Sequence, residues 1–162
     1  MAVSYVTPMG LSAGQKNMVT NPYAGDLSVA DAWALLEREP KAQLVDVRTS
    51  AEWSFVGLPD LSALGREPLC VEWQRYPDMA ANADFVTQVG ALARRSGANE
   101  ATPLLFLCRS GARSRAAAIA MTQAGFRNAY NVAGGFEGDL DESRHRGRRN
   151  GWKVQGLPWR QS

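Results

Sequence analysis

The chain has 162 residues, of which 45% are hydrophobic and 21% are charged, and its formal net charge is +2. These values are typical of one soluble domain that buries its own core. Two cysteines, Cys70 and Cys108, and one histidine, His145, exclude a disulfide framework and offer no metal site. No apolar run approaches the roughly 18 residues of a membrane-spanning helix, so we expect no membrane partner.

The first segment, residues 1–25, is rich in Gly, Ser, Asn, Thr and Pro and predicts an irregular arm over the surface. It lacks the basic start and the continuous apolar core of a signal peptide. A free reactive thiol suits a reducing compartment. The sequence therefore predicts a cytoplasmic protein.

A helix is predicted from Ser28, which can cap the free N–H groups, to the residue before Pro40. A short strand over 42–47 follows, with Asp46 and Arg48 at its end. Such side chains often point into a ligand crevice. The simpler interpretation is a salt bridge beside a helix cap from Thr49 or Ser50, and Glu52 is then a residue of that short helix.

The middle of the chain is less informative. A strand over 69–71 places Cys70 in the core, where a role as a second reactive thiol is the less favoured alternative. The aromatic, charged segment 72–78 is either a recognition loop at the rim of a site or an ordinary packed loop. Asn82 is the predicted cap of a helix that ends at Gly97.

The most informative stretch is residues 103–125. An apolar strand, Leu104 to Leu107, and an alanine-rich helix, Ala116 to Met121, flank a tight polar loop that begins at Cys108. The inward N–H groups of such a loop and the positive end of the helix stabilise an anion, here the thiolate. Because His145 lies far away in the sequence, we expect the loop to activate the thiol without a histidine.

Residues 108–114 read Cys-Arg-Ser-Gly-Ala-Arg-Ser and closely resemble the active-site loop of rhodanese-like sulfurtransferases. The resemblance implies that Cys108 is a catalytic nucleophile. It would take a sulfane sulfur from thiosulfate or a similar small anion, hold it as a persulfide and pass it to cyanide or a thiol, and no cofactor is implied. The substrate-binding residues it implies are Arg109, Ser110, Gly111, Ala112, Arg113 and Ser114. Their N–H groups would surround the outer sulfur, while the side chains of Arg109 and Arg113 orient the donor.

Two further segments resemble the family. Asp46-Val-Arg48 is similar to a segment that supports the sheet edge near the catalytic loop, so we interpret this pair as structural support for the loop. Gly134-Gly135 resembles a double-glycine turn beside the active site, where glycine permits close approach of backbones or positive φ. Relatives commonly carry a histidine after the Glu, but this chain reads Phe55-Val-Gly57 there.

Two alternatives stay open. Cysteine phosphatases also place a thiolate in a loop closed by arginine, but with five residues between the two, whereas Cys108 and Arg113 have four between them. The shorter loop suits a single sulfur atom better than a phosphoryl group. The second alternative is a persulfide relay, in which Cys108 exchanges sulfur with a protein partner and free thiosulfate is a poor donor.

Strands that alternate with helices predict α/β architecture. The resemblance, over 26–140, implies a rhodanese-like fold with a central, mostly parallel five-stranded sheet and helices on both faces. We expect this domain to cover 26–143. Residues 144–162, which hold six Lys or Arg and no acid, form a basic tail that packs on the domain and buries Trp152 and Trp159. No aromatic residue interrupts the arginines of 144–149, so we expect a solvated tail that binds no nucleic acid.

Overall fold

The computed structural model describes residues 21–162, so most of the predicted arm lies outside the described residues. A five-stranded parallel sheet forms the centre, in the order β1-β8-β7-β2-β4. Its strands are β1 (Gly25–Leu27), β2 (Gln43–Asp46), β4 (Leu69–Cys70), β7 (Leu104–Leu107) and β8 (Ala129–Val132). All residues of β2 and β7 are buried, as expected for central parallel strands covered on both faces.

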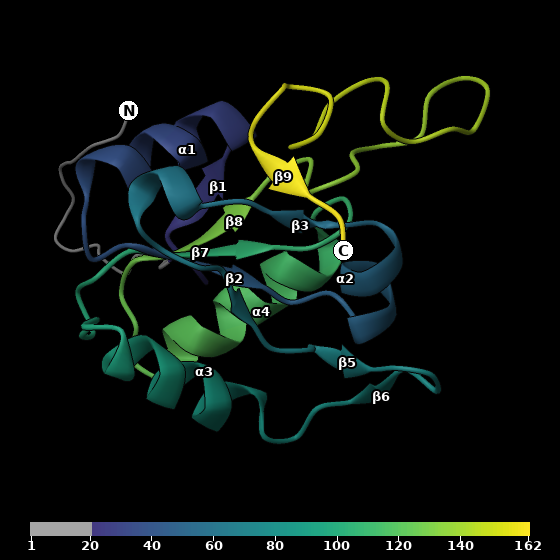
Figure 1. The fold of residues 1–162 in the computed structure, drawn as a ribbon. Helices are drawn as coiled ribbons and strands as arrows, with labels where there is room; N and C mark the ends of the chain where they lie inside the picture. The colour runs from purple at the N-terminus through teal and green to yellow at the C-terminus, as the bar shows by residue number, and fades with distance from the viewer. Residues whose placement is uncertain (1–20) are drawn as a thin grey trace, which may run out of the picture.

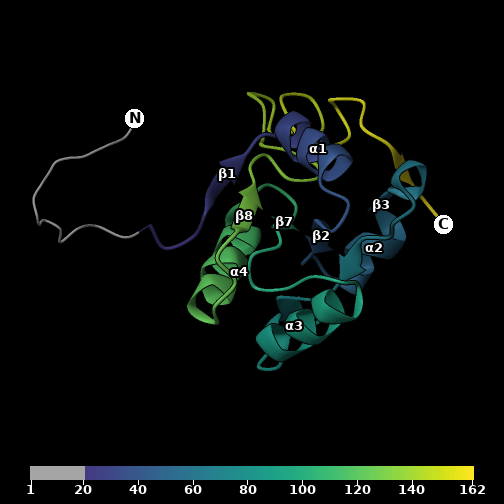
Figure 2. The ribbon, with the colours of Figure 1, turned by 90° about the vertical axis from the view of Figure 1, so that its left-hand side faces the viewer.

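Helices cover both faces of this sheet, as the sequence predicted (Figures 1 and 2). Helix α1 (Val29–Arg38) and the segment after β8 lie on one face, while α3 (Phe85–Arg95) and α4 (Ala112–Gln123) lie on the other. The short helix α2 (Ser50–Phe55) follows β2, and a 3-10 turn, η1 (Ser62–Leu64), precedes β4. The predicted α/β class and five-stranded sheet are confirmed.

Each face has its own hydrophobic core. Phe85 and Val89 of α3 and Met121 of α4 pack against one face of the central strands. On the other face, Leu36 of α1 packs with Trp152. The tail is therefore part of the second core, since Trp152 is fully buried and its indole N–H donates to the carbonyl of residue 158 at 2.7 Å.

Two short antiparallel strand pairs lie outside the main sheet. Strand β3 (Leu58–Pro59) pairs with β9 (Trp159–Arg160), and β5 (Gln74–Arg75) pairs with β6 (Ala80–Ala81). The predicted burial of Trp159 is wrong, because this residue lies on strand β9 of the β3–β9 pair and is 38% exposed. The segment predicted as an aromatic loop, 72–78, forms the first half of the β5–β6 pair.

Of the helix caps predicted from the sequence at Ser28 and Asn82, one is confirmed and one is wrong. The Ser28 cap is confirmed, since its hydroxyl accepts from the Asp31 N–H at 3.1 Å, and α1 ends before Pro40. Asn82 is not the N-cap residue of α3. That position is Asp84, and the Asn82 side chain accepts from the Asp84 N–H at 3.1 Å. In residues 21–162, no helix has the length and apolar character needed to cross a bilayer.

Cys70 does not lie in the core as predicted. It is exposed at the end of β4, which is an edge strand of the sheet. Partial desolvation of its thiol by neighbouring groups, and then the charge of Asp46, raise the pKa of Cys70 to about 12. A thiol that stays protonated at neutral pH is a poor nucleophile.

Candidate active site

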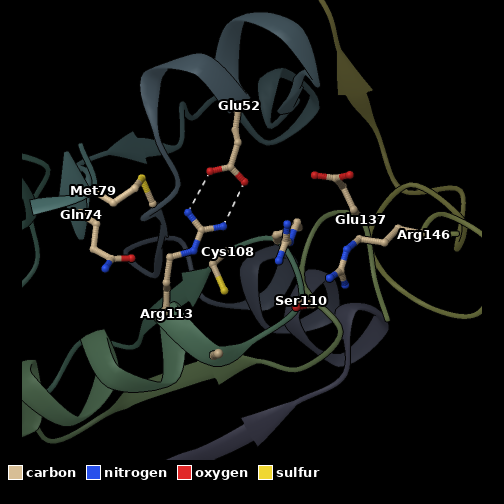
Figure 3. Close-up of a pocket in the computed structure, with 10 residues that line it drawn as sticks. Glu52, Gln74, Met79, Cys108, Ser110, Arg113, Glu137 and Arg146 are labelled. Atoms are coloured by element: carbon tan, nitrogen blue, oxygen red, sulfur yellow. Dashed lines mark hydrogen bonds and ion pairs between the residues drawn. The ribbon is translucent and has the colours of Figure 1, made fainter. Parts of the chain in front are cut away.

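Cys108 is the first residue after β7 and lies at the bottom of a pocket (Figure 3). Its side chain is 1% exposed. The Gly111 N–H donates to its sulfur at 3.1 Å, and the Ser114 hydroxyl lies 3.2 Å from the same atom. The sulfur is thus held by polar groups of its own loop.

The helix behind the loop begins earlier than the sequence predicted. α4 starts at Ala112 rather than at Ala116, with Gly111 in the N-cap position at φ 124°. Because that φ is accessible mainly to glycine, the chain turns into the helix within three residues of Cys108. The first-turn N–H groups of Ala112, Arg113 and Ser114 donate to no acceptor within residues 21–162. They form the positive end of a helix beside the sulfur.

The double-glycine turn holds the loop from the opposite side. The Phe136 N–H donates to the Cys108 carbonyl at 2.8 Å, and the Glu137 N–H donates to the Arg109 carbonyl at 3.0 Å. A Cβ on Gly135, where φ is 64°, would lie 2.5 Å from both of these carbonyl oxygens. The turn therefore requires glycine for close approach as well as for its backbone conformation.

Asp46 and Arg48 do not line the pocket. They form a fully buried ion pair of 2.7 Å, and the Arg48 guanidinium also donates to the Gly57 carbonyl at 2.8 Å. The same guanidinium lies 4.3 Å from the centre of the Phe136 ring. The pair thus lies beside Phe136, whose N–H donates to the Cys108 carbonyl.

The pocket above the sulfur has a volume of about 490 Å³. Charged and polar groups from four separate segments of the chain line it (Figure 3). The lining residues are Glu52, Gln74, Met79, Cys108, Arg109, Ser110, Ala112, Arg113, Glu137 and Arg146. Of the loop residues that the sequence named, Gly111 and Ser114 contact the sulfur from below and the others line the pocket directly.

Arg113 is not free in this pocket. Its guanidinium makes two hydrogen bonds to Glu52 of α2, at 2.8 and 3.0 Å. Burial alone would raise the pKa of Glu52, but the hydrogen bonds and charge of Arg113, together with bonds from Thr49, lower it to about 2. The hydrogen bonds to Glu52 in turn raise the pKa of Arg113. The pocket therefore holds a fixed ion pair beside the sulfur.

Sequence reasoning missed several of these residues. Glu52 was interpreted only as part of a helix, although its capping box with Thr49 fixes it at the end of β2, next to β7. Arg146 belongs to the tail that was expected to be solvated, yet it lines the pocket and donates to the Gly138 carbonyl at 2.8 Å. Asn131, a polar residue in the buried strand β8, accepts from the Ser114 hydroxyl at 2.6 Å. A polar side chain in an apolar strand was the available signal.

The described residues, 21–162, contain no group of three or more His, Cys, Asp or Glu side chains placed to hold a metal ion. His145 is exposed and is not among the residues that line the pocket. The pocket places the Cys108 sulfur beneath the charged side chains of its lining.

Comparison with known proteins agrees with this geometry. A family model described as the STR4 middle domain matches residues 24–162. The chloroplastic protein THYLAKOID RHODANESE-LIKE from Oryza sativa subsp. indica is 31% identical over 140 residues, which are 86% of this chain and 26% of that protein. This chain belongs to the rhodanese-like family.

Two further proteins match this chain over nearly their whole length. The crystal structure of Rv0390 from M. tuberculosis is 50% identical, has a TM-score of 0.76, and covers 86% of this chain and 99% of that chain. The uncharacterized protein RP600 homolog of Rickettsia rickettsii is 36% identical over 128 residues, or 79% of this chain and 90% of that protein. A single rhodanese-like domain thus accounts for most of the sequence.

Proposed function

We propose that this rhodanese-like protein is a sulfurtransferase that carries a sulfane sulfur on Cys108. The observation on which the proposal rests is the position of the Cys108 sulfur at the bottom of the pocket. There it accepts from the Gly111 N–H at 3.1 Å and lies beside the unpaired first turn of α4. Amide groups and a helix end placed in this way stabilise negative charge on sulfur without a general base.

The reaction has two displacement steps. The Cys108 thiolate attacks the outer sulfur of thiosulfate, the sulfur–sulfur bond of the donor breaks, and sulfite leaves with the bonding electrons. The resulting persulfide anion lies among the loop amides. An acceptor, cyanide or a thiolate, then attacks the outer sulfur and departs with it, which regenerates the Cys108 thiolate.

The lining of the pocket favours a small anionic donor. Arg109 and Arg146 line the pocket without a salt bridge to an acidic side chain within the described residues, whereas Arg113 is paired with Glu52. A pocket of about 490 Å³ admits a molecule of the size of thiosulfate, and Cys108 is only 1% exposed, so a bulky group could not reach it directly. The loop, with four residues between Cys108 and Arg113, also suits a single sulfur atom better than a phosphoryl group.

The direct test is the intact mass of the purified, reduced protein before and after incubation with thiosulfate. We expect a gain of one sulfur atom in the wild type and in Cys70→Ser, and none in Cys108→Ser. A mass gain in the Cys108→Ser variant would overturn the assignment of the nucleophile. Steady-state kinetics with thiosulfate and cyanide then separate an enzyme from a relay, since fast ping-pong turnover is expected only of the enzyme.

A further inference from the structure

We propose that Asn131 is a positioning residue for Cys108. It competes with the sulfur for the single hydrogen of the Ser114 hydroxyl. The Ser114 oxygen lies 3.2 Å from the Cys108 sulfur and 2.6 Å from the Asn131 side-chain oxygen. Ser114 is fully buried and Asn131 is 5% exposed. A hydroxyl carries one hydrogen, so Ser114 can donate to only one of these two acceptors at a time.

The orientation of the Asn131 amide is fixed by its other neighbour. Its nitrogen donates to the Asp26 carboxylate at 3.0 Å, and the Tyr23 hydroxyl donates to the same carboxylate oxygen at 2.8 Å. An ionised carboxylate only accepts hydrogen bonds, so the amide nitrogen must face Asp26 and the amide oxygen must face Ser114. Asp26 and Asn131 are direct partners in the β1–β8 register, so the sheet itself holds this arrangement.

The two protonation states of Cys108 use the Ser114 hydrogen differently. In the thiol, the S–H group donates to Ser114, and Ser114 donates to Asn131, so that every group is satisfied. When the thiol proton leaves to solvent, the sulfur needs the Ser114 hydrogen, and the Asn131 oxygen then loses its only donor among residues 21–162. A buried acceptor without a donor is unfavourable. Asn131 therefore opposes the thiolate.

The loaded state restores the first arrangement. This step rests on the proposed function. In a persulfide, the Cys108 sulfur is a neutral inner sulfur, which is a weak acceptor, and the charge has moved to the outer sulfur near the loop amides. The Ser114 hydrogen returns to Asn131. Asn131 thus favours the sulfur-loaded form over the empty thiolate, and no atom of Ser114 or Asn131 is transferred.

Other charged groups around Cys108 must stay constant in the test. The groups that face the sulfur or lie behind its hydrogen-bonded partners are Tyr23, Asp26, Asp46, Glu52, Arg109, Arg113, Arg115, Glu137 and Arg146. Substitution of Ser114 or Asn131 changes none of their charges. A shift in the reactivity profile then does not arise from a change in these charges.

The experiment measures the rate of alkylation of reduced protein by iodoacetamide against pH, in a Cys70→Ser background so that only Cys108 reacts. For Ser114→Ala we expect the midpoint of the profile to rise by about one pH unit, because the thiolate loses a donor. For Asn131→Leu and Asn131→Ala we expect it to fall by about one unit, because the competing acceptor is gone. A merely structural role would disturb the loop and move both in the same direction. An unchanged or raised midpoint in the folded Asn131 variants would overturn the proposal.

A second pair of variants covers the case in which the buried substitutions prevent folding. Asp26 is exposed, so Asp26→Ala and Asp26→Asn are expected to fold. Both remove the charge, but only Asn retains an acceptor for the Asn131 amide. We expect a lower midpoint in Asp26→Ala than in Asp26→Asn, and equal midpoints would contradict the inference.

Asn128→Leu is the matched control for Asn131→Leu. It changes an amide just before β8 that donates to the Ala101 carbonyl, and its midpoint should match that of the wild type.

Alkylation needs no sulfur donor, so its outcome is independent of sulfur transfer. If thiosulfate adds no mass but the midpoints move as stated, the proposed function fails and the role of Asn131 stands. If thiosulfate adds mass and the midpoints do not move, only the role of Asn131 fails.

Discussion

The guanidinium of Arg113 and the carboxylate of Glu52 form a two-pronged ion pair, with N–O distances of 2.8 and 3.0 Å, although they are 61 residues apart in the chain. Arg113 lies in the first turn of α4 and Glu52 in the first turn of α2. The pair therefore ties the loop that carries Cys108 to the helix that follows β2. It also decides how much positive charge the pocket offers.

This ion pair predicts an acid-dependent part of stability. The pKa of Glu52 is about 2 in the folded protein, below its ordinary value of 4.5. A carboxyl whose pKa is lower in the folded state stabilises it above pH ~4.5, and this contribution disappears as the pH falls through 2. After discounting for solvent screening, we expect the Glu52 carboxylate to contribute about 1–2 kcal/mol to the free energy of unfolding at neutral pH.

The measurement is chemical denaturation of the wild type and Glu52→Gln from pH 7 to pH 2. The difference in unfolding free energy should be constant above pH ~5 and shrink toward zero near pH 2. Glu67→Gln is a suitable control, since its side chain is 74% exposed and does not line the pocket. A difference that does not change with pH would show that Glu52 acts only through packing.

Arg113→Ala should weaken the anionic donor. The variant removes a cation and leaves the Glu52 carboxylate unpaired beside the sulfur, where it repels thiosulfate. Because charged hydrogen bonds contribute ~1.5–3 kcal/mol, we expect the Michaelis constant for thiosulfate to rise roughly tenfold or more. The double variant with Glu52→Gln should recover part of this loss, since the repelling charge is gone. An unchanged Michaelis constant in Arg113→Ala would count against a role in donor binding.

Gly135→Ala should disrupt the loop itself. The added Cβ would lie 2.5 Å from the carbonyl oxygens of Cys108 and Arg109, which are backbone atoms and cannot rotate away. We expect a loss of roughly 2–4 kcal/mol in stability together with loss of the sulfur mass gain. The control is Gly156→Ala, where φ is also positive at 77° but nothing lies within 4 Å, so only the backbone cost of about 1 kcal/mol applies. Equal costs in the two variants would contradict the close approach.

Arg146→Gln tests the contribution of the tail to the pocket. Arg146 is half-buried at the rim, whereas Arg144, two residues earlier, is exposed and does not line the pocket. We expect kcat/KM for thiosulfate to fall several-fold in Arg146→Gln and to depend less on salt, because a nearby charge that attracts the donor is gone. Arg144→Gln should match the wild type. Similar losses in both would indicate a general effect of net charge instead.

The sequence predicted the parts of this protein whose causes are local. The apolar strand Leu104–Leu107, the Ser28 cap and the glycine-permitted turn after β8 each follow from a few adjacent residues. The start of α4 was misplaced because Gly111 was interpreted as part of the loop rather than as the N-cap residue. The predicted core position of Cys70 was wrong because nothing in a short apolar run tells a central strand from an edge strand.

The side chains that complete the pocket could not be predicted in the same way. Glu52 and Arg146 line it, and Asn131 accepts from Ser114 behind it, each from a distant segment that folding brings to the Cys108 loop. A resemblance centred on the cysteine loop implies the site residues of that loop, but not the side chains that other segments bring to it. The polar character of Asn131 within a buried strand was the one sign in the sequence that β8 contributes more than packing.

The order of the strands also has a consequence for how the chain folds. Among the described residues, strand β1 pairs only with β8, which lies more than one hundred residues later in the chain, and β9 follows β3 at a similar separation. Contacts so far apart in sequence are slow to form, because long segments must close before pairing is rewarded. During synthesis Cys108 therefore emerges on its strand before Glu137 and Arg146, so its pocket is completed only after these later segments have been made.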